Sequence, residues 1–352
     1  MPAVGSVYPR GHFFQQLAGA HQPSATDMVS NRVYFGLQLS ATFLYGCLRT
    51  EDGEMIEIVR RFSHHENKAQ AAAGEESLDS PPAFLLVQTT EIDHQNLRFD
   101  MPRMQAAAVT NNARIYLDGK EAVWKPADGT RGKPFEIRFS EEACSWVEQG
   151  LWTLKGRLVK PGLHWYLPGR DYGTYYVSQI FEVEGEYEGR RVRGMVGFDQ
   201  TYMGEGGDLY KTKDLVLENK AHIVWYTWGT RYKDGTVEAG HFMLGHDRMG
   251  FAVFTDGANV TATQAIDGRV FPKEGGKFAD RIELTIDGVA WEFLPDPRGC
   301  MPDMLRKHPP TPQQEGRWRR VGDTREPDVW FAWGETEPDH GFERQRKLPT
   351  FK

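Results

Sequence analysis

An acidic residue, Asp199, follows a run of small and apolar residues that begins at Gly194, and it is the first candidate for chemistry. A carboxylate that points into an apolar interior is unstable there, and its pKa rises when water is removed. Such a group can act as a general acid or base near neutral pH. The alternative is that Asp199 accepts backbone hydrogen bonds at a strand end and fixes a domain junction. The sequence leaves both possibilities open.

Aromatic residues near Asp199 and further along the chain could bind an apolar molecule. In the run that begins at Trp225, strand alternation places Tyr226 and Trp228 on one face. The other face carries Trp225 and Thr227. Each aromatic taken alone is expected to be a core residue, but their density indicates an apolar pocket. The candidate substrate-binding residues are Tyr166, Tyr176, Phe198, Gln200, Tyr202, Trp225, Tyr226 and Trp228.

Two histidines are candidate partners of Asp199 in proton transfer. His164 lies two residues before Tyr166, so both share a face if the segment is extended, and a histidine there could move a proton near pH 7. The favoured alternative is a loop that packs its aromatic residues over a barrel mouth. His241 is the second candidate, because its strand follows the aromatic run. The spacings between His222, His241 and His246 match no zinc motif, so we predict no metal site.

The elements that must position these residues are short strands joined by turns. Residues 32–49 alternate well enough for a long strand with Phe43 and Tyr45 among its anchors, and 55–62 returns as its partner. Further hairpins are expected about Asp118-Gly119 and about Glu188-Gly189, and 329–333 resembles a final strand. Repeated strands without helical periodicity indicate an all-β protein with little helix.

Composition narrows the class of protein. The chain has 352 residues and a net charge of −7, which gives no sign of nucleic-acid binding. Its three cysteines, Cys47, Cys144 and Cys300, are too few and too irregular for a disulfide framework, so a cytoplasmic location is expected. No signal-peptide pattern and no apolar run of membrane-spanning length is present. A monomer and a homodimer are both compatible with the sequence.

The central segment also resembles a known family. The order Tyr-Tyr-x-Ser from Tyr175, then Val-x-Gly-x-x-x-Gly, Val-x-Gly and Phe-Asp-Gln, is similar to the AttH/CrtC-like family, which includes carotenoid 1,2-hydratases and certain fungal Diels–Alderases. The resemblance implies two tandem lipocalin-like antiparallel β-barrels, expected at 1–190 and 191–352. That family usually has a histidine and an acidic residue after the central aspartate, whereas this chain has Gln200 and Thr201.

We therefore expect a cofactor-independent enzyme that acts on a hydrophobic, unsaturated small molecule such as a terpenoid, polyketide or aromatic metabolite. The resemblance implies acid-assisted hydration or dehydration, isomerisation or cyclisation, with Asp199, His164 and His241 as the catalytic candidates. Two alternatives stay open because of the residues at 200 and 201. One is a non-catalytic carrier of a lipophilic ligand, and the other is a pericyclase that works by shape.

Overall fold

The structure is a computed structural model that describes residues 16–64, 83–107, 113–128, 130–169, 173–210, 213, 221–246, 248–302 and 312–344. Almost all regular structure is antiparallel β, as the sequence predicts, and it forms two large sheets that curl into barrel-like units. Among the described residues, the helical elements are α2 (Ala25–Met28), α4 (Met101–Ala106) and η2 (Pro338–His340). None of the helices in the described part of the chain is long and apolar enough to cross a membrane.

The first sheet has thirteen strands, in the order β5-β4-β3-β2-β13-β12-β10-β9-β8-β7-β6, with β11 on β12 and β1 on β11. Its strands are β1 (Leu17–Ala20), β2 (Gln38–Thr50), β3 (Met55–Ser63), β4 (Ala83–Thr89), β5 (Arg98–Phe99), β6 (Ala113–Asp118), β7 (Glu121–Pro126), β8 (Phe135–Phe139), β9 (Ala143–Glu148), β10 (Trp152–Leu158), β11 (Leu163–Leu167), β12 (Thr174–Tyr187) and β13 (Arg190–Met203).

The second sheet has nine strands, in the order β17-β16-β15-β14-β22-β21-β20-β19-β18. The first strand of this sheet along the chain, β14, lies near the centre of the sheet, and the last strand, β22, pairs with β14. Its strands are β14 (His222–Tyr232), β15 (Val237–Gly245), β16 (Gly250–Thr255), β17 (Val260–Thr263), β18 (Ile266–Pro272), β19 (Ala279–Ile286), β20 (Val289–Cys300), β21 (Gln313–Arg320) and β22 (Pro327–Thr336).

Turn chemistry decides where several strands begin and end. The predicted hairpin about Glu188-Gly189 joins β12 to β13, and both turn residues have positive φ, 48° and 78°, as a two-residue hairpin turn requires. The strand expected over 32–49 starts only at Gln38, because Phe35 and Gly36 also have positive φ and form a separate turn. The final strand predicted at 329–333 is part of β22.

The sheets divide later in the chain than the expected boundary after residue 190. That boundary falls within the β12–β13 hairpin, whose second strand pairs with β2 of the first sheet. The second sheet begins at His222. We propose that the domain boundary lies in the connection between Met203 and His222.

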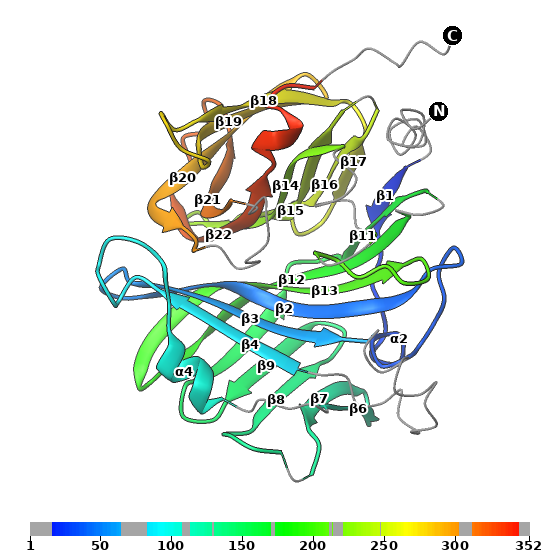
Figure 1. Cartoon of the computed structure of the whole chain (residues 1–352), viewed down its shortest axis with the longest axis vertical. Coiled ribbons are helices and arrows are strands. Elements are labelled where there is room, and N and C mark those ends of the chain that lie inside the picture. Colours follow the sequence, from blue (N-terminus) through cyan, green and yellow to red (C-terminus); the bar gives the residue numbers. More distant parts are fainter. Residues whose placement is uncertain are drawn as a thin grey trace.

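Four apolar clusters account for the packing of the described residues: one inside each unit, one between the units, and a smaller one around Tyr175 and Tyr202. The cluster between the units joins β2, β11, β12 and β13 of the first sheet to β14, β15, β16 and β22 of the second. Figure 1 shows β2, β12 and β13 lying between the second sheet and the rest of the first. The residues of these strands that point toward the other sheet are therefore mostly buried, and a buried polar group needs a partner.

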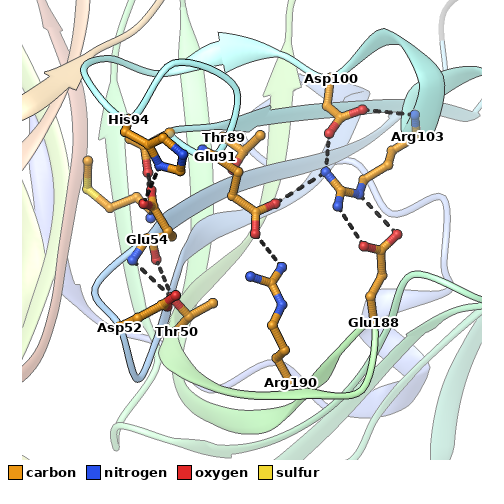
Figure 2. A network of polar contacts seen from close by, with 12 residues as sticks. Thr50, Asp52, Glu54, Thr89, Glu91, His94, Asp100, Arg103, Glu188 and Arg190 are labelled. Carbon is orange, nitrogen blue, oxygen red and sulfur yellow. Dashed lines mark hydrogen bonds and ion pairs between the residues drawn. The ribbon is translucent and has the colours of Figure 1, made fainter.

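Polar side chains fasten the far end of the β12–β13 hairpin, as Figure 2 shows. Arg103 of α4 donates from Nε and Nη2 to the Glu188 carboxylate, at 3.1 and 2.6 Å. The same guanidinium lies 3.3 Å from Glu91, which also pairs with Arg190. This network ties the turn of the hairpin to α4 and to Glu91, which follows β4.

Candidate functional site

A cavity of about 200 Å³ lies between the two sheets, and its walls combine apolar and hydroxyl-bearing side chains. Alternation on β2 and β14 decides which residues reach it, because every second residue points toward the opposite sheet. The apolar part is lined by Phe43, Val59, Phe84, Leu86, Leu209, Trp225 and Trp333, and the polar part by Tyr45, Arg61, Tyr176, Tyr210, Thr227, Gln313 and Glu335.

The carboxyl group of Asp199 lies behind this cavity and is held by two phenols of its wall. Asp199 on β13 is fully buried, and its Oδ2 accepts hydrogen bonds from Tyr45 at 2.6 Å and Tyr176 at 2.7 Å. Burial raises the pKa of Asp199 to about 6, although the hydroxyls of Ser178 and both tyrosines oppose the shift. Asp199 therefore changes its protonation state near neutral pH. The hydroxyl groups of Tyr45 and Tyr176 connect its carboxyl group to the cavity.

Residues of the second sheet extend the hydrogen-bond chain. Tyr45 also bonds to Thr227 Oγ1 at 2.6 Å, and Thr227 bonds to Nδ1 of His241 at 3.0 Å. Burial lowers the pKa of His241 to about 3, so its ring is neutral. When Tyr45 donates to an ionised Asp199, Thr227 must donate to Tyr45, and His241 must donate from Nδ1 to Thr227. Nε2 of His241 then carries the lone pair, and this buried nitrogen has no partner among the described residues.

Aromatic rings fix the two phenols in place. Trp165 stacks on Tyr176 at 4.7 Å with an interplanar angle of 8°, and Trp225 meets the same ring edge-on at 5.5 Å. Tyr45 packs against Trp333 at 5.7 Å. A Cβ at Gly197 would lie 3.0 Å from the Tyr45 ring, so this glycine provides the room that the phenol occupies. The donors are thus held before any ligand binds.

A second polar group lines the cavity. The Glu335 carboxylate accepts hydrogen bonds from Tyr210, at 3.1 and 3.2 Å, and from Gln313 Nε2, at 2.9 Å. Gln313 in turn accepts from the Trp333 indole at 3.1 Å. A ligand in this cavity would therefore meet the two phenols and a hydrogen-bonded carboxylate.

Three of the residues predicted from the sequence come together here. Asp199 and Tyr176 share one hydrogen bond, and Trp225 lines the same cavity. His241 joins them through Thr227, although it does not line the cavity itself.

Four other predicted residues point into the interiors of the two units. Phe198 packs on Phe139 inside the first, with ring centroids 4.2 Å apart, and Gln200 donates to the Met28 carbonyl at 2.9 Å. Tyr226 and Trp228 belong to the core of the second unit. Strand alternation explains these positions, because residues next to Asp199 or Trp225 must face the opposite side of the sheet.

The remaining predicted residues form a separate aromatic group at β11, β12 and the end of β13. His164 bonds through Nδ1 to the Tyr175 hydroxyl at 3.1 Å, and its pKa is lowered by burial. Tyr166 stacks on Phe35 at 4.3 Å, and Tyr202 packs in the same cluster. None of these three lines the cavity described above.

Two residues that carry the site, Tyr45 and Thr227, are not among those predicted from the sequence. Tyr45 appeared only as an apolar anchor of its strand, and Thr227 only as the neighbour of aromatic residues. Both hydroxyls gain their role from a contact between residues 182 positions apart in the chain. The sequence gives one indication of this role, because both residues alternate with core residues along their strands and therefore face the other sheet.

Comparisons with known proteins find similarity in structure only. No protein-family model and no curated protein matches the chain. A putative AttH from Nitrosomonas europaea is similar with 14% sequence identity and a TM-score of 0.49, over 86% of this chain and 94% of that protein. CghA is similar with 11% identity and a TM-score of 0.47, over 88% and 89% of the two chains. Kievitone hydratase from Nectria haematococca is similar with 8% identity and a TM-score of 0.40, over 85% and 89%. These similarities concern structure alone, and one of the three proteins bears the name of the family that the central segment resembles.

Proposed function

We propose that the chain is an enzyme that catalyses acid-assisted hydration or dehydration, isomerisation or cyclisation of a hydrophobic, unsaturated small molecule. One observation carries the proposal, namely a buried carboxyl group that titrates near neutrality beneath two phenols of an apolar cavity. The volume of about 200 Å³ is below the roughly 300–1,000 Å³ of typical ligand sites, so the substrate is compact or inserts only one end.

Tyr45 is the proton donor in this proposal, and Asp199 supplies the replacement proton. When Asp199 is protonated, it donates to the Tyr45 oxygen, which also accepts from Thr227, so the phenolic proton is directed into the cavity. Delivery of that proton to the substrate is accompanied by transfer of the Asp199 proton to Tyr45, and a carboxylate remains. Tyr176 keeps its hydrogen bond to Oδ2 and stabilises that carboxylate.

The remaining steps restore the enzyme. In hydration, the proton adds to an alkene carbon, water captures the cation, and the proton that water loses returns through Tyr45 to Asp199. In dehydration, the same proton leaves with the substrate hydroxyl as water, and the adjacent carbon then loses a proton, which forms the alkene and returns through Tyr45 to Asp199. The ring faces of Tyr176 and Trp225 can stabilise the developing positive charge by cation–π interaction. Binding a neutral, apolar substrate keeps water away from Asp199 and maintains its raised pKa.

Two other functions suit the same cavity, and both are distinguished by experiment. A carrier would bind the ligand and return it unchanged. A pericyclase would hold a reactive conformer and need no acid, which suits a carboxyl that does not itself line the cavity. The location in the cytoplasm, the independence from a cofactor and the choice between monomer and homodimer remain predictions from the sequence.

The test begins with native mass spectrometry of the protein to identify co-purifying ligands, followed by turnover of those ligands and related alkenes in D₂O. The variants are Asp199→Asn and Tyr45→Phe. Tyr175→Phe is the matched control, because this tyrosine lies next to Tyr176 but faces away from the cavity. We expect one deuterium on a product carbon, and turnover at least about 100-fold lower in both site variants with ligand binding retained.

Two results would overturn acid catalysis. Equal product formation by Asp199→Asn and the wild type would establish a catalyst that works by shape. A ligand bound by every variant and released unchanged by all of them would establish a carrier.

A further inference from the structure

A second buried cluster lies further along the same interface and has no part in the proposed reaction. Cys47 and Glu57 are paired residues of the neighbouring strands β2 and β3, and Glu315 reaches them from β21 of the second sheet. All three residues are buried, and one potential ligand atom from each lies within 4.8 Å of the others. The cluster is distinct from the cavity, since none of its members lines it.

Glu57 is the unusual member of the cluster. Its side chain is 0% exposed, and neither carboxylate oxygen has a hydrogen-bond partner among the described residues. A buried carboxyl group in that state loses the free energy of hydration without compensation. One of its oxygens lies within 4.8 Å of the Cys47 sulfur and of a Glu315 carboxylate oxygen, so the three side chains converge on one point.

The one nearby cation is already engaged. Arg49 lies 3.1 Å from Glu315 and 3.3 Å from Asp296, and it packs over the Trp330 ring at 4.5 Å. The other oxygen of Glu315 accepts from the Ala332 amide at 3.2 Å. No described ion pair includes Glu57. Burial raises the pKa of the Cys47 thiol and of the Glu57 carboxyl group, so an ion that binds here displaces their protons.

We propose that Cys47, Glu57 and Glu315 form a binding site for a divalent transition-metal ion that links the two sheets. One thiolate and two carboxylates are a ligand set that Zn²⁺ accepts, with a fourth position left for water. Zn–S and Zn–O bonds of about 2.3 and 2.1 Å place tetrahedral ligand atoms roughly 3.5 Å apart, so side-chain rotations of about 1 Å close the site. Binding transfers the protons of the thiol and of protonated carboxyl groups to solvent.

Arg49, whose guanidinium contacts Glu315, also lines a hollow of about 290 Å³ together with residues of β13 and β22. The sequence did not predict this site, because its ligands come from three strands and have no motif spacing.

The test uses the full-length protein, treated with a chelator and then titrated with Zn²⁺ or Co²⁺. We expect one ion per chain by elemental analysis, and with Co²⁺ a thiolate-to-metal charge-transfer band in the near ultraviolet. Cys47→Ser should abolish the band. Glu57→Gln, which conserves the shape, should weaken binding by at least about tenfold, since loss of a ligand costs no less than loss of an outer-shell partner.

Two cysteines serve as controls. Cys144→Ser alters an equally buried thiol inside the first unit, and Cys300→Ser removes a half-buried thiol near Lys273. Both variants should keep the band. A wild type without a band at saturating Co²⁺ would overturn the proposal, and the cluster would then be a carboxyl pair that shares a proton. A band that is lost in Cys300→Ser but kept in Glu57→Gln would also overturn the proposal.

Discussion

The protonation of Asp199 makes a quantitative prediction about folding stability. Its pKa in the folded protein is about 6, against an ordinary 3.8, so the folded state binds the proton more tightly than the unfolded state. Asp199 therefore contributes stability that is fully present below pH 3.8 and is lost as the pH rises through 6. The whole difference corresponds to about 3 kcal/mol, and no reduction for solvent screening applies because the group is fully buried.

The perturbation is Asp199→Asn, which keeps the shape and removes the titration. With a folded pKa of about 6, lowering the pH from 7 to 5 should raise the free energy of unfolding of the wild type by about 1.3 kcal/mol relative to the variant. The assay is urea denaturation of both proteins at several values between pH 4.5 and 8. Taking the difference at each pH removes the contributions of Glu57, Glu315 and every other group common to both.

The groups that face Asp199 justify the sign. Tyr45, Tyr176 and Ser178 are neutral donors, and His241 is uncharged because burial lowers its pKa to about 3. Parallel curves for the wild type and the variant would refute the titration near pH 6. A wild type that loses stability relative to Asp199→Asn on acidification would show a lowered pKa, and the carboxylate would then be a structural acceptor without an acid role.

Three further predictions concern side chains around the site and in the first unit. Gly197→Ala should displace the Tyr45 ring by a few tenths of an ångström and reduce turnover more than ligand binding. Separate measurements of kcat and KM test this, and an unchanged kcat would mean that the ring has room to shift. Glu148→Gln breaks a fully buried ion pair with Arg60 and should cost about 3–5 kcal/mol in urea denaturation, so a loss below about 1 kcal/mol would contradict the pairing. Arg103→Gln removes a partly exposed network of ion pairs and should lower the free energy of unfolding by less than about 1 kcal/mol, with a smaller effect in high salt. A loss that does not depend on salt would indicate that Arg103 acts through its packing on the Tyr187 ring.

The sequence was sufficient for the elements and their faces. Positive φ at Glu188 and Gly189 is what the turn pattern predicts, and the hairpin register follows from that turn. The separation of Trp225 and Thr227 from Tyr226 and Trp228 is likewise correct, since the first pair lines the cavity and the second lies in the core. The same alternation, applied to Asp199, would have placed Phe198 and Gln200 on the opposite face.

The assembly of the site could not be predicted in this way. Periodicity indicates which face of β2 or β14 is buried, but it does not say which sheet packs there or at what register. Tyr45 and Thr227 meet only because two long strands from different sheets cross at one point. The likeness of residues 175–200 to a family pattern pointed to Asp199, whereas the phenol that reaches the cavity lies outside that pattern.

The positions of the two polar clusters follow from one physical requirement. Sheets that pack face to face bury the inward residues of both, and any polar group among them must find its partner across the interface. Tyr45 and Cys47 point the same way from β2, and each leads to polar residues of the second sheet, Thr227 in one case and Glu315 in the other. Neither cluster is complete on a single sheet. The chemistry of this protein therefore depends on the register between its two units, and apolar contacts such as that of Tyr45 with Trp333 hold the donors at hydrogen-bonding distance.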